Sequence, residues 1–264
     1  MNSGADRDKN LAQAGRLIAQ AGAVGACLVV LPEVFAFIGA DLSEQLGVCE
    51  DDGAGPIQDF LATQARAHGV WLVGGTVPVR APQADRAYAA CMLYDPKGER
   101  VAVYRKIHLF DAHVRDTGED YSESNVFTSG DDVVVADTPF GRCGLAVCYD
   151  LRFPELFRAM LDRGVNFIVL PSAFTAATGQ AHWEVLLRAR AIENLVYVIA
   201  PNQTGTHANG RETWGHSMVI NPWGQVIASL DADEGVAVAE IDLASQERVR
   251  REFPCVTHRC IEDS

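Results

Sequence analysis

Short apolar runs alternate along this chain with longer stretches in which apolar residues recur every three or four positions. The first long stretch extends from Asp8 to about Ala23, and this spacing predicts a helix with one apolar face. The run "CLVVLPEVF" (27–35) that follows is short and almost wholly apolar, which predicts a buried strand. A second helix is predicted over 58–68, and a further strand over "VWLVGGTVPV" (70–79). Such alternation is typical of an α/β or layered α+β fold.

The segment "YAACMLYDPKGERVAVYRK" (88–106) predicts a hairpin of two strands. The connecting residues are Asp95-Pro96-Lys97-Gly98. Proline at the second position and glycine at the fourth position favour a type I turn.

The second half of the chain repeats the order of elements in the first half. "NFIVLPSAF" (166–174) echoes 27–35, a predicted helix over 182–194 echoes 58–68, "VYVIAPNQTG" (196–205) echoes 70–79, and the turn at 221–224 echoes 95–98. The offset is 139 residues at the Leu-Pro pairs and 126 at the turns, so the first half carries about 13 extra residues. We place them in the segment 36–56. Two such halves, with their sheets face to face and helices outside, predict a four-layer α-β-β-α sandwich with an internal pseudo-twofold repeat.

The repeat also predicts a strand that this sequence does not contain. In the second half, "RCGLAV" (142–147) reads as a strand before a helix that starts near Pro154. The matching strand of the first half would lie before Asn2, where the chain has no such residues. We therefore treat residues 1–264 as one domain without its first strand, and expect a version extended at the N-terminus to be markedly more stable.

Composition and charge limit the possible functions. The chain has 264 residues, of which 48% are hydrophobic and 22% are charged, as expected for a globular protein with a sizeable core. Its net charge of −13 opposes nonspecific binding to nucleic acid or to an anionic membrane, because both need a basic surface. A small anionic substrate stays possible if a local Arg or Lys meets it.

Targeting and cysteine signals point to the cytoplasm. The sequence contains no apolar run long enough to span a bilayer, and its first ten residues lack the pattern of a secretion signal. Seven cysteines are an odd number, scattered through a long chain, which favours a reducing compartment over a disulfide framework. Cys255, His258 and Cys260 do not have the spacing of a zinc site, so we expect no metal there.

Three reactive side chains stand at the ends of three predicted strands: Glu33, Lys106 and Cys148. Each has a plain structural explanation when taken alone, namely a Glu at the rim of a sheet, a surface Lys, and a buried inert Cys. Together they supply a base, a cationic stabiliser and a nucleophile. His108, two residues after Lys106, is a rival base, although a structural role for it is equally compatible with the sequence.

The residues after Cys148 favour the catalytic interpretation of this cysteine. Pro154 and Glu155 suit the first turn of a helix. A cysteine just before such a turn can point its sulfur at free backbone N–H groups, which lower a thiol pKa and hold an oxyanion.

At these residues the chain resembles the nitrilase superfamily of carbon–nitrogen hydrolases. "LPEVF" is similar to the Glu motif of that family, "YRKIHLFD" to its Lys motif and "CYDLRFPE" to its Cys motif. The resemblance implies an α-β-β-α sandwich and an amidase that needs no cofactor and no metal. It implies that Cys148 is the nucleophile, Glu33 the general base and Lys106 the stabiliser of the tetrahedral intermediate. Glu123, in "DYSESNVF", resembles the second glutamate of that family, which supports Lys106 and the substrate.

Within the superfamily, "PSAFTAATGQAHWEVLLRARAIEN" and "GHSMVINPWG" resemble the deaminated-glutathione amidases. This implies cleavage of a linear amide through a thioester, with deaminated glutathione as the expected substrate. The alternatives are an ω-amidase acting on 2-oxoglutaramate and a hydrolase of N-carbamoyl or ureido compounds. We expect the backbone N–H of Tyr149 to help hold the oxyanion, and Arg152 either to bind a substrate carboxylate or to brace the turn. Family members commonly form dimers, and the tail from Glu247 to Ser264 could cross to a partner.

Overall fold

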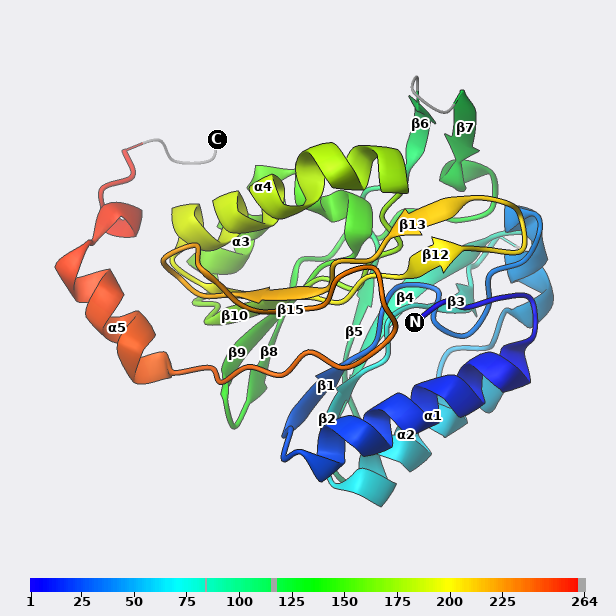
Figure 1. The fold of residues 1–264 in the computed structure, drawn as a ribbon, viewed down its shortest axis with the longest axis horizontal. Coiled ribbons are helices and arrows are strands. Elements are labelled where there is room, and N and C mark those ends of the chain that lie inside the picture. The colour runs from blue at the N-terminus through cyan, green and yellow to red at the C-terminus, as the bar shows by residue number, and fades with distance from the viewer. Residues whose placement is uncertain (84, 115–117, 261–264) are drawn as a thin grey trace.

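The computed structural model describes residues 1–83, 85–114 and 118–260, and it has four layers in the order helices, sheet, sheet, helices (Figure 1). The first sheet has the strand order β1-β2-β4-β3, with β5 also paired to β4. Its strands are β1 (Leu28–Val30), β2 (Trp71–Val73), β3 (Val77–Arg80), β4 (Ala87–Tyr94) and β5 (Arg100–Arg105). Helices α1 (Arg7–Ala23) and α2 (Pro56–His68) cover its outer face (Figure 1).

The second sheet has the strand order β15-β14-β11-β10-β9-β8. Its strands are β8 (Val134–Thr138), β9 (Gly141–Leu145), β10 (Phe167–Val169), β11 (Tyr197–Ala200), β14 (Met218–Ile220) and β15 (Val226–Ser229). Helices α3 (Pro154–Asp162) and α4 (Ala176–Asn194) cover the outer face of this sheet (Figure 1).

Two apolar cores hold the layers together. One contains Tyr104 and Leu93 of the first sheet together with Leu145 and Phe167 of the second, so it joins the two sheets and continues under α3 and α4. The other lies between the first sheet and the pair α1 and α2. Burial of both sheet faces explains why the strands read as continuous apolar runs and not as alternating ones. The predicted sandwich is confirmed.

Equivalent hydrogen bonds mark the predicted repeat. β1 pairs with β2 in parallel, as β10 does with β11. The N–H of Leu31 donates to the carbonyl of Val73 at 2.9 Å, and the N–H of Leu170 donates to that of Ile199 at 2.9 Å. The two turns also match, because the glycine N–H at 98 and at 224 each closes its turn at 2.9 Å. The offsets of these pairs are those found in the sequence.

Two predicted elements differ from the structure. The strand expected over 70–79 is wrong as one element, because it divides into β2 and β3 at Gly74-Gly75. Gly75 has φ +54°, and a Cβ there would lie 2.0 Å from the carbonyl oxygen of Pro32, so only glycine fits this bend. The helix predicted from 182 begins earlier, at Ala176.

The remaining elements surround one edge of the sandwich or follow it. They are the hairpins β6 (Asp111–Val114) with β7 (Glu119–Ser122) and β12 (Thr204–Thr206) with β13 (Glu212–Trp214), helix α5 (Leu243–Glu252), and the 3₁₀ turns η1 (Leu42–Val48), η2 (Glu123–Asn125), η3 (Cys148–Arg152) and η4 (Cys255–Thr257). Among the described residues, no helix is both long and apolar enough to cross a membrane. The last part of the predicted tail, 261–264, lies outside the described residues.

Candidate active site

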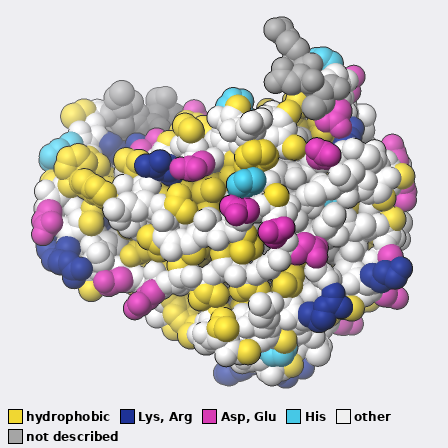
Figure 2. All heavy atoms as spheres, in the orientation of Figure 1, with side chains coloured by type: hydrophobic (Ala, Val, Ile, Leu, Met, Phe, Trp, Pro, Cys, Tyr) yellow, Lys and Arg dark blue, Asp and Glu magenta, His cyan; other side chains and the backbone are white. Residues whose placement is uncertain are grey.

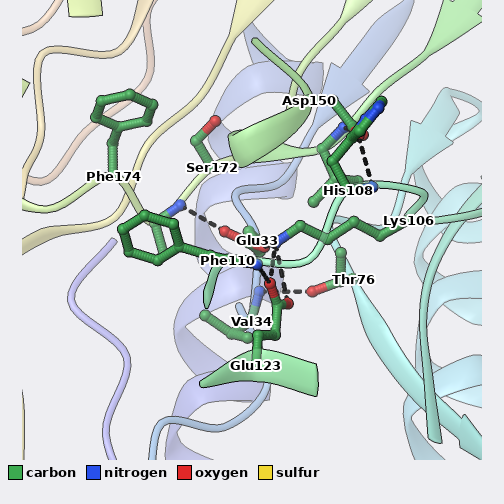
Figure 3. A network of polar contacts seen from close by, with 12 residues as sticks. Glu33, Val34, Thr76, Lys106, His108, Phe110, Glu123, Asp150, Ser172 and Phe174 are labelled. Atoms are coloured by element: carbon green, nitrogen blue, oxygen red, sulfur yellow. Dashed lines mark hydrogen bonds and ion pairs between the residues drawn. The ribbon is translucent and has the colours of Figure 1, made fainter. Parts of the chain in front are cut away.

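Glu33 lies just past the end of β1, and its side chain is buried where the two sheets meet (Figure 3). One carboxylate oxygen, Oε2, accepts a hydrogen bond from the N–H of Ala173 at 2.9 Å. The next residue, Val34, has φ +49° and its N–H donates to Thr76 Oγ1 at 2.9 Å, which fixes the turn. A β-branched residue in the left-handed region is strained, so the turn holds the Glu33 side chain in one direction at a cost in local stability.

Lys106 follows the last residue of β5 and is 2% exposed. Its Nζ donates to Glu33 Oε1 at 2.9 Å and to both carboxylate oxygens of Glu123, each at 2.9 Å (Figure 3). Burial alone would lower the pKa of Lys106, but the carboxylates of Glu123 and Glu33 outweigh it and raise this pKa well above its usual range. Lys106 is therefore a fixed buried cation.

Glu123, the first residue of η2, is the second carboxylate on this cation. It also accepts a hydrogen bond from the N–H of Phe110 at 2.6 Å. Burial and, less strongly, the neighbouring Glu33 raise the pKa of Glu123, while Lys106 opposes this rise. Lys106 thus compensates two buried carboxylates at once.

Cys148 is the first residue of η3 and follows Val147, whose backbone is still extended although β9 ends at Leu145. It has φ +44°, and its N–H donates to the carbonyl of Pro171 at 3.0 Å. Burial, followed by the negative charge of Glu33, raises the pKa of its thiol well above the usual value, although Lys106 and the N–H of Ala173 act in the other direction. The expected lowering of this pKa is therefore wrong: Cys148 rests as a neutral thiol beside a carboxylate.

A second polar network, which the sequence did not predict, holds the turn after Cys148 (Figure 3). Asp150 is fully buried and accepts hydrogen bonds from Tyr104 Oη at 2.7 Å and from the N–H of Val147 at 2.8 Å. Its other oxygen accepts from the N–H of His108 at 3.2 Å and lies 2.7 Å from His108 Nδ1. The His108 ring also stacks on Phe153 at 3.6 Å. His108 is thus engaged in holding the turn, and the structure favours its structural interpretation.

Tyr149 and Arg152 belong to this turn, and their side chains contact a cluster of aromatic rings. The Tyr149 ring is 4.9 Å from that of Phe110. The Arg152 guanidinium lies 5.2 Å from the ring centroid of Phe174, and its Nη1 is 3.3 Å from His182 Nδ1. Ala173, the residue before Phe174, donates its N–H to Glu33. Arg152 therefore lies close to the reactive groups, although it takes part in none of their ion pairs.

The Carbon-nitrogen hydrolase family model matches residues 1–251. The chain belongs to the carbon–nitrogen hydrolase family. The deaminated glutathione amidase of Synechocystis sp. (strain PCC 6803 / GT-S) is 43% identical over 262 residues, which cover 98% of this chain and 95% of that protein.

Solved structures agree with this assignment. Saccharomyces cerevisiae Nit3, a member of branch 10 of the nitrilase superfamily, matches with a TM-score of 0.88 and 30% identity, over 98% of this chain and 93% of that one. An amidase from Nesterenkonia sp. AN1, in a mutant showing Michael addition of acrylamide at its active site cysteine, matches with a TM-score of 0.79 and 27% identity, over 96% and 95%. The chain is accordingly a hydrolase of carbon–nitrogen bonds outside peptides.

This carbon–nitrogen hydrolase brings together the side chains predicted from three separate strand ends. Glu33 contacts Lys106 directly, and Glu33 and Lys106 are the charged groups that act most strongly on the Cys148 thiol. Glu123 completes the ion-pair cluster through its two contacts with Lys106. A partly exposed thiol beside a buried carboxylate and a buried ammonium group can carry out nucleophilic acyl transfer. Within the described ranges, no group of three or more His, Cys, Asp or Glu residues is placed to hold a metal ion.

The residues that the sequence did not predict are those that position this cluster. One feature of the sequence could have indicated a role for Asp150, namely its position two residues after Cys148 on the turn. A feature of the same kind could have indicated Tyr104, because it lies on the same strand face as Lys106. Neither signal predicts that they bond to each other across 46 residues of sequence, because this contact depends on how the two sheets face each other.

Proposed function

We propose that this hydrolase is an amidase whose nucleophile is Cys148, and that it cleaves deaminated glutathione to 2-oxoglutarate and Cys-Gly. The proposed catalytic roles are supported by one observation: Glu33, Lys106 and Glu123 form a buried cluster beside the Cys148 thiol, which is neutral. Support for the substrate is the name of the Synechocystis relative, with which the chain shares 43% identity.

In the proposed mechanism, Cys148 Sγ attacks the amide carbonyl carbon while its proton passes to the carboxylate of Glu33. The carbonyl electron pair moves onto the oxygen, and Lys106 Nζ and the N–H of Tyr149 stabilise this oxyanion. When the oxyanion collapses, the carbon–nitrogen bond breaks and Glu33 gives its proton to the leaving nitrogen. The product that remains is a thioester on Cys148.

Water then completes the cycle. It attacks the thioester carbon while Glu33 takes one of its protons, and the second oxyanion is held by the same two donors. Collapse releases the carboxylic acid, and the Cys148 sulfur recovers its proton from Glu33. Because burial and Glu33 raise the pKa of the thiol, the resting Cys148 keeps its proton, and this is the proton that passes to Glu33 in the first step.

Arg152 is the cation that we propose for a carboxylate of the substrate. Deaminated glutathione has two carboxylates, and the net charge of the protein, −13, makes a local cation necessary. The Arg152 guanidinium lies against Phe174 and His182, next to the reactive cluster. Arg152→Lys keeps the charge but loses the planar fork, so we expect KM to rise about tenfold with kcat little changed. An unchanged KM would exclude this contact.

The deciding experiment is a substrate screen with Cys148→Ala as the blank. It compares deaminated glutathione, 2-oxoglutaramate, simple ω-amides and N-carbamoyl acids by product formation, and it looks for an acyl adduct on Cys148 by intact mass. We expect the highest kcat/KM for deaminated glutathione and no turnover in the blank. Preference for 2-oxoglutaramate would make the protein an ω-amidase, and ammonia with CO₂ would indicate a ureido substrate. Turnover in the blank would reject the mechanism itself.

We further propose that the protein works in the cytoplasm as a homodimer. All seven cysteines, each within the described residues, are free thiols, which suits a reducing compartment. Four exposed apolar residues on and beside α4 and α5 offer a surface for a second copy: Val185, Ile192, Trp223 and Phe253. Trp223 and Phe253 already contact each other at 5.7 Å between ring centroids. Light scattering after gel filtration should give twice the mass of the chain, and a monomer would exclude the dimer.

A further inference from the structure

A row of three aromatic rings has an arginine at each end. The ring centroids of Tyr121 and Phe110 are 4.8 Å apart, and those of Phe110 and Tyr149 are 4.9 Å apart. At one end, the guanidinium of Arg211 lies 4.1 Å from the ring centroid of Tyr121. At the other end, the guanidinium of Arg152 lies 6.0 Å from that of Tyr149. The proposed mechanism uses Arg152 but gives no role to Arg211.

The middle of this row belongs to the candidate active site. The N–H of Phe110 donates to the carboxylate of Glu123 at 2.6 Å (Figure 3). Tyr149 follows Cys148 directly in η3. The row therefore passes the reacting groups at its middle and has one arginine on each side of them.

Arg211 comes from a different part of the fold, the loop between β12 and β13, beside the β6–β7 hairpin (Figure 1). Its Nη2 donates to the carbonyl of Asp120 in β7 at 2.9 Å, and its Nε lies 3.7 Å from Glu119 Oε1. Its charge also acts on the carboxylate of Asp41. The two close contacts use the edge formed by Nε and Nη2. No described residue accepts a hydrogen bond from Nη1, and 36% of the side chain is exposed.

The position of this guanidinium suits a carboxylate ligand. Because it lies over the face of Tyr121, its N–H groups are directed sideways, away from the ring. The end formed by Nη1 and Nη2 can give a carboxylate two parallel hydrogen bonds. Acidic side chains are prominent on the face of the molecule in Figure 2, and the net charge is −13. An anion therefore depends on single cations of this kind for its binding.

The leaving part of deaminated glutathione is long enough to reach Arg211. One substrate carboxylate belongs to the acyl part, and the other belongs to the glycine of the Cys-Gly that leaves. Two extended residues span about 7 Å at most. The first step along the row, from Phe110 to Tyr121, is 4.8 Å, and Arg211 lies 4.1 Å from the Tyr121 ring. The shorter acyl part suits Arg152, which belongs to the same turn as Cys148.

We propose that Arg211 binds the carboxylate of the leaving group while Arg152 binds that of the acyl group. The site then selects linear amides that have a carboxylate on both sides of the scissile bond. This assignment rests on the proposed amidase function, and it supplies a physical reason for the expected preference between two substrates. Deaminated glutathione has a carboxylate on its leaving group, whereas 2-oxoglutaramate releases ammonia and has none there. Arg211 is thus a specificity residue that takes no part in proton transfer.

The test measures binding to Cys148→Ala by calorimetry, so that turnover does not interfere. The ligands are deaminated glutathione and the same molecule with its glycine carboxylate replaced by a carboxamide. We expect the acid to bind about tenfold more tightly, because it alone gains charged hydrogen bonds to Arg211. With Arg211→Met added, the two ligands should bind equally. A preference for the acid that persists in Arg211→Met would overturn the proposal, and so would equal binding while Arg211 is present.

The carboxamide and a second arginine variant serve as controls. The carboxamide reports on the rest of the site, so an equal loss for both ligands in Arg211→Met would indicate damage to the hairpins and contradict the proposed contact. Arg80→Met also removes one positive charge, from an arginine on β3 that pairs with Asp51 at 3.0 Å. We expect it to keep the preference for the acid. Loss of the preference in Arg80→Met would mean that the field of the whole protein causes it.

Turnover by the unaltered chain tests the proposed function separately. If deaminated glutathione is cleaved, the ratio of its kcat/KM to that of 2-oxoglutaramate should fall about tenfold in Arg211→Met. An unchanged ratio would overturn the role of Arg211 and leave the amidase function standing. If deaminated glutathione is not cleaved but its binding depends on Arg211, the proposed function fails and the carboxylate site stands. If it does not bind at all, both fail.

Discussion

At the scale of single residues, Lys106 has two roles in one position. It is the cation proposed to hold the oxyanion, and it compensates two carboxylates that are both buried. Lys106→Met keeps the length of the side chain but leaves Glu33 and Glu123 facing each other without a cation. We expect this variant to lose activity and also about 3–5 kcal/mol of stability near neutral pH.

The pH dependence separates this explanation from simple loss of packing. Without Lys106, burial and repulsion from Glu33 raise the pKa of the Glu123 carboxyl group further above that of the unfolded chain. The folded state then binds more protons than the unfolded state, so stability is regained as pH falls toward 5. Urea unfolding at pH 8 and at pH 5.5 measures this, with Lys97→Met as the exposed control. An equal loss at both pH values would contradict the electrostatic explanation.

The Cys148 thiol gives a second prediction at this scale. Because its pKa is raised, the protonated form persists through neutral pH, and Lys106 does not hold a thiolate in the resting site. The absorbance difference at 240 nm between the protein and Cys148→Ala should show no thiolate step below about pH 9. A step near pH 6–7 would mean that the resting site is a thiolate–ammonium pair and that Glu33 is not needed for the first proton transfer.

At the scale of elements, the turn η3 decides where the nucleophile points. Its conformation, with Cys148 at φ +44°, is strained and needs support. Asp150 supplies this by joining Val147 to Tyr104 and His108. Asp150→Asn places an NH₂ group opposite these donors, so we expect a loss of about 2–3 kcal/mol in stability.

As a positioning residue, Asp150 should also affect rate. We expect Asp150→Asn to lower kcat about tenfold or more while KM changes little, and alkylation of Cys148 by iodoacetamide to slow in parallel. Asp137→Asn, an exposed carboxylate on β8, is the control. Unchanged kcat in a folded Asp150→Asn protein would show that η3 holds Cys148 without this network.

Elements that depend on contacts between residues close in sequence could be predicted, and features that depend on contacts between distant residues could not. Apolar period and turn residues were enough for α1, α2 and the β4–β5 hairpin, because these depend on neighbours in sequence. The break at Gly75 was not predictable, since its cause is the backbone of Pro32, 43 residues away. Strand ends indicated Glu33, Lys106 and Cys148, whereas Asp150 depends on a contact between the two sheets.

At the scale of the whole molecule, the internal repeat places the ends of equivalent strands next to each other, and the candidate active site lies where they meet. The equivalent strands β1 and β10 each lead into a Leu-Pro step, and the face-to-face sheets bring these ends together. Glu33 follows one Leu-Pro pair, and Ala173, whose N–H binds its carboxylate, follows shortly after the other. The repeat was visible in the sequence, but this contact across the two halves was not.

The net charge of −13 gives the last prediction, which concerns how substrate reaches the site. A dianionic amide is repelled by the field of the whole protein but attracted at short range by Arg152 if that residue binds it. Salt weakens the long-range repulsion more than a close contact. We therefore expect kcat/KM for deaminated glutathione to rise roughly two- to threefold between 10 and 200 mM NaCl. A neutral ω-amide, which does not respond to the field, is the control. A steady fall for the dianion would mean that local cations dominate its approach, and that the acidic surface lies away from its path.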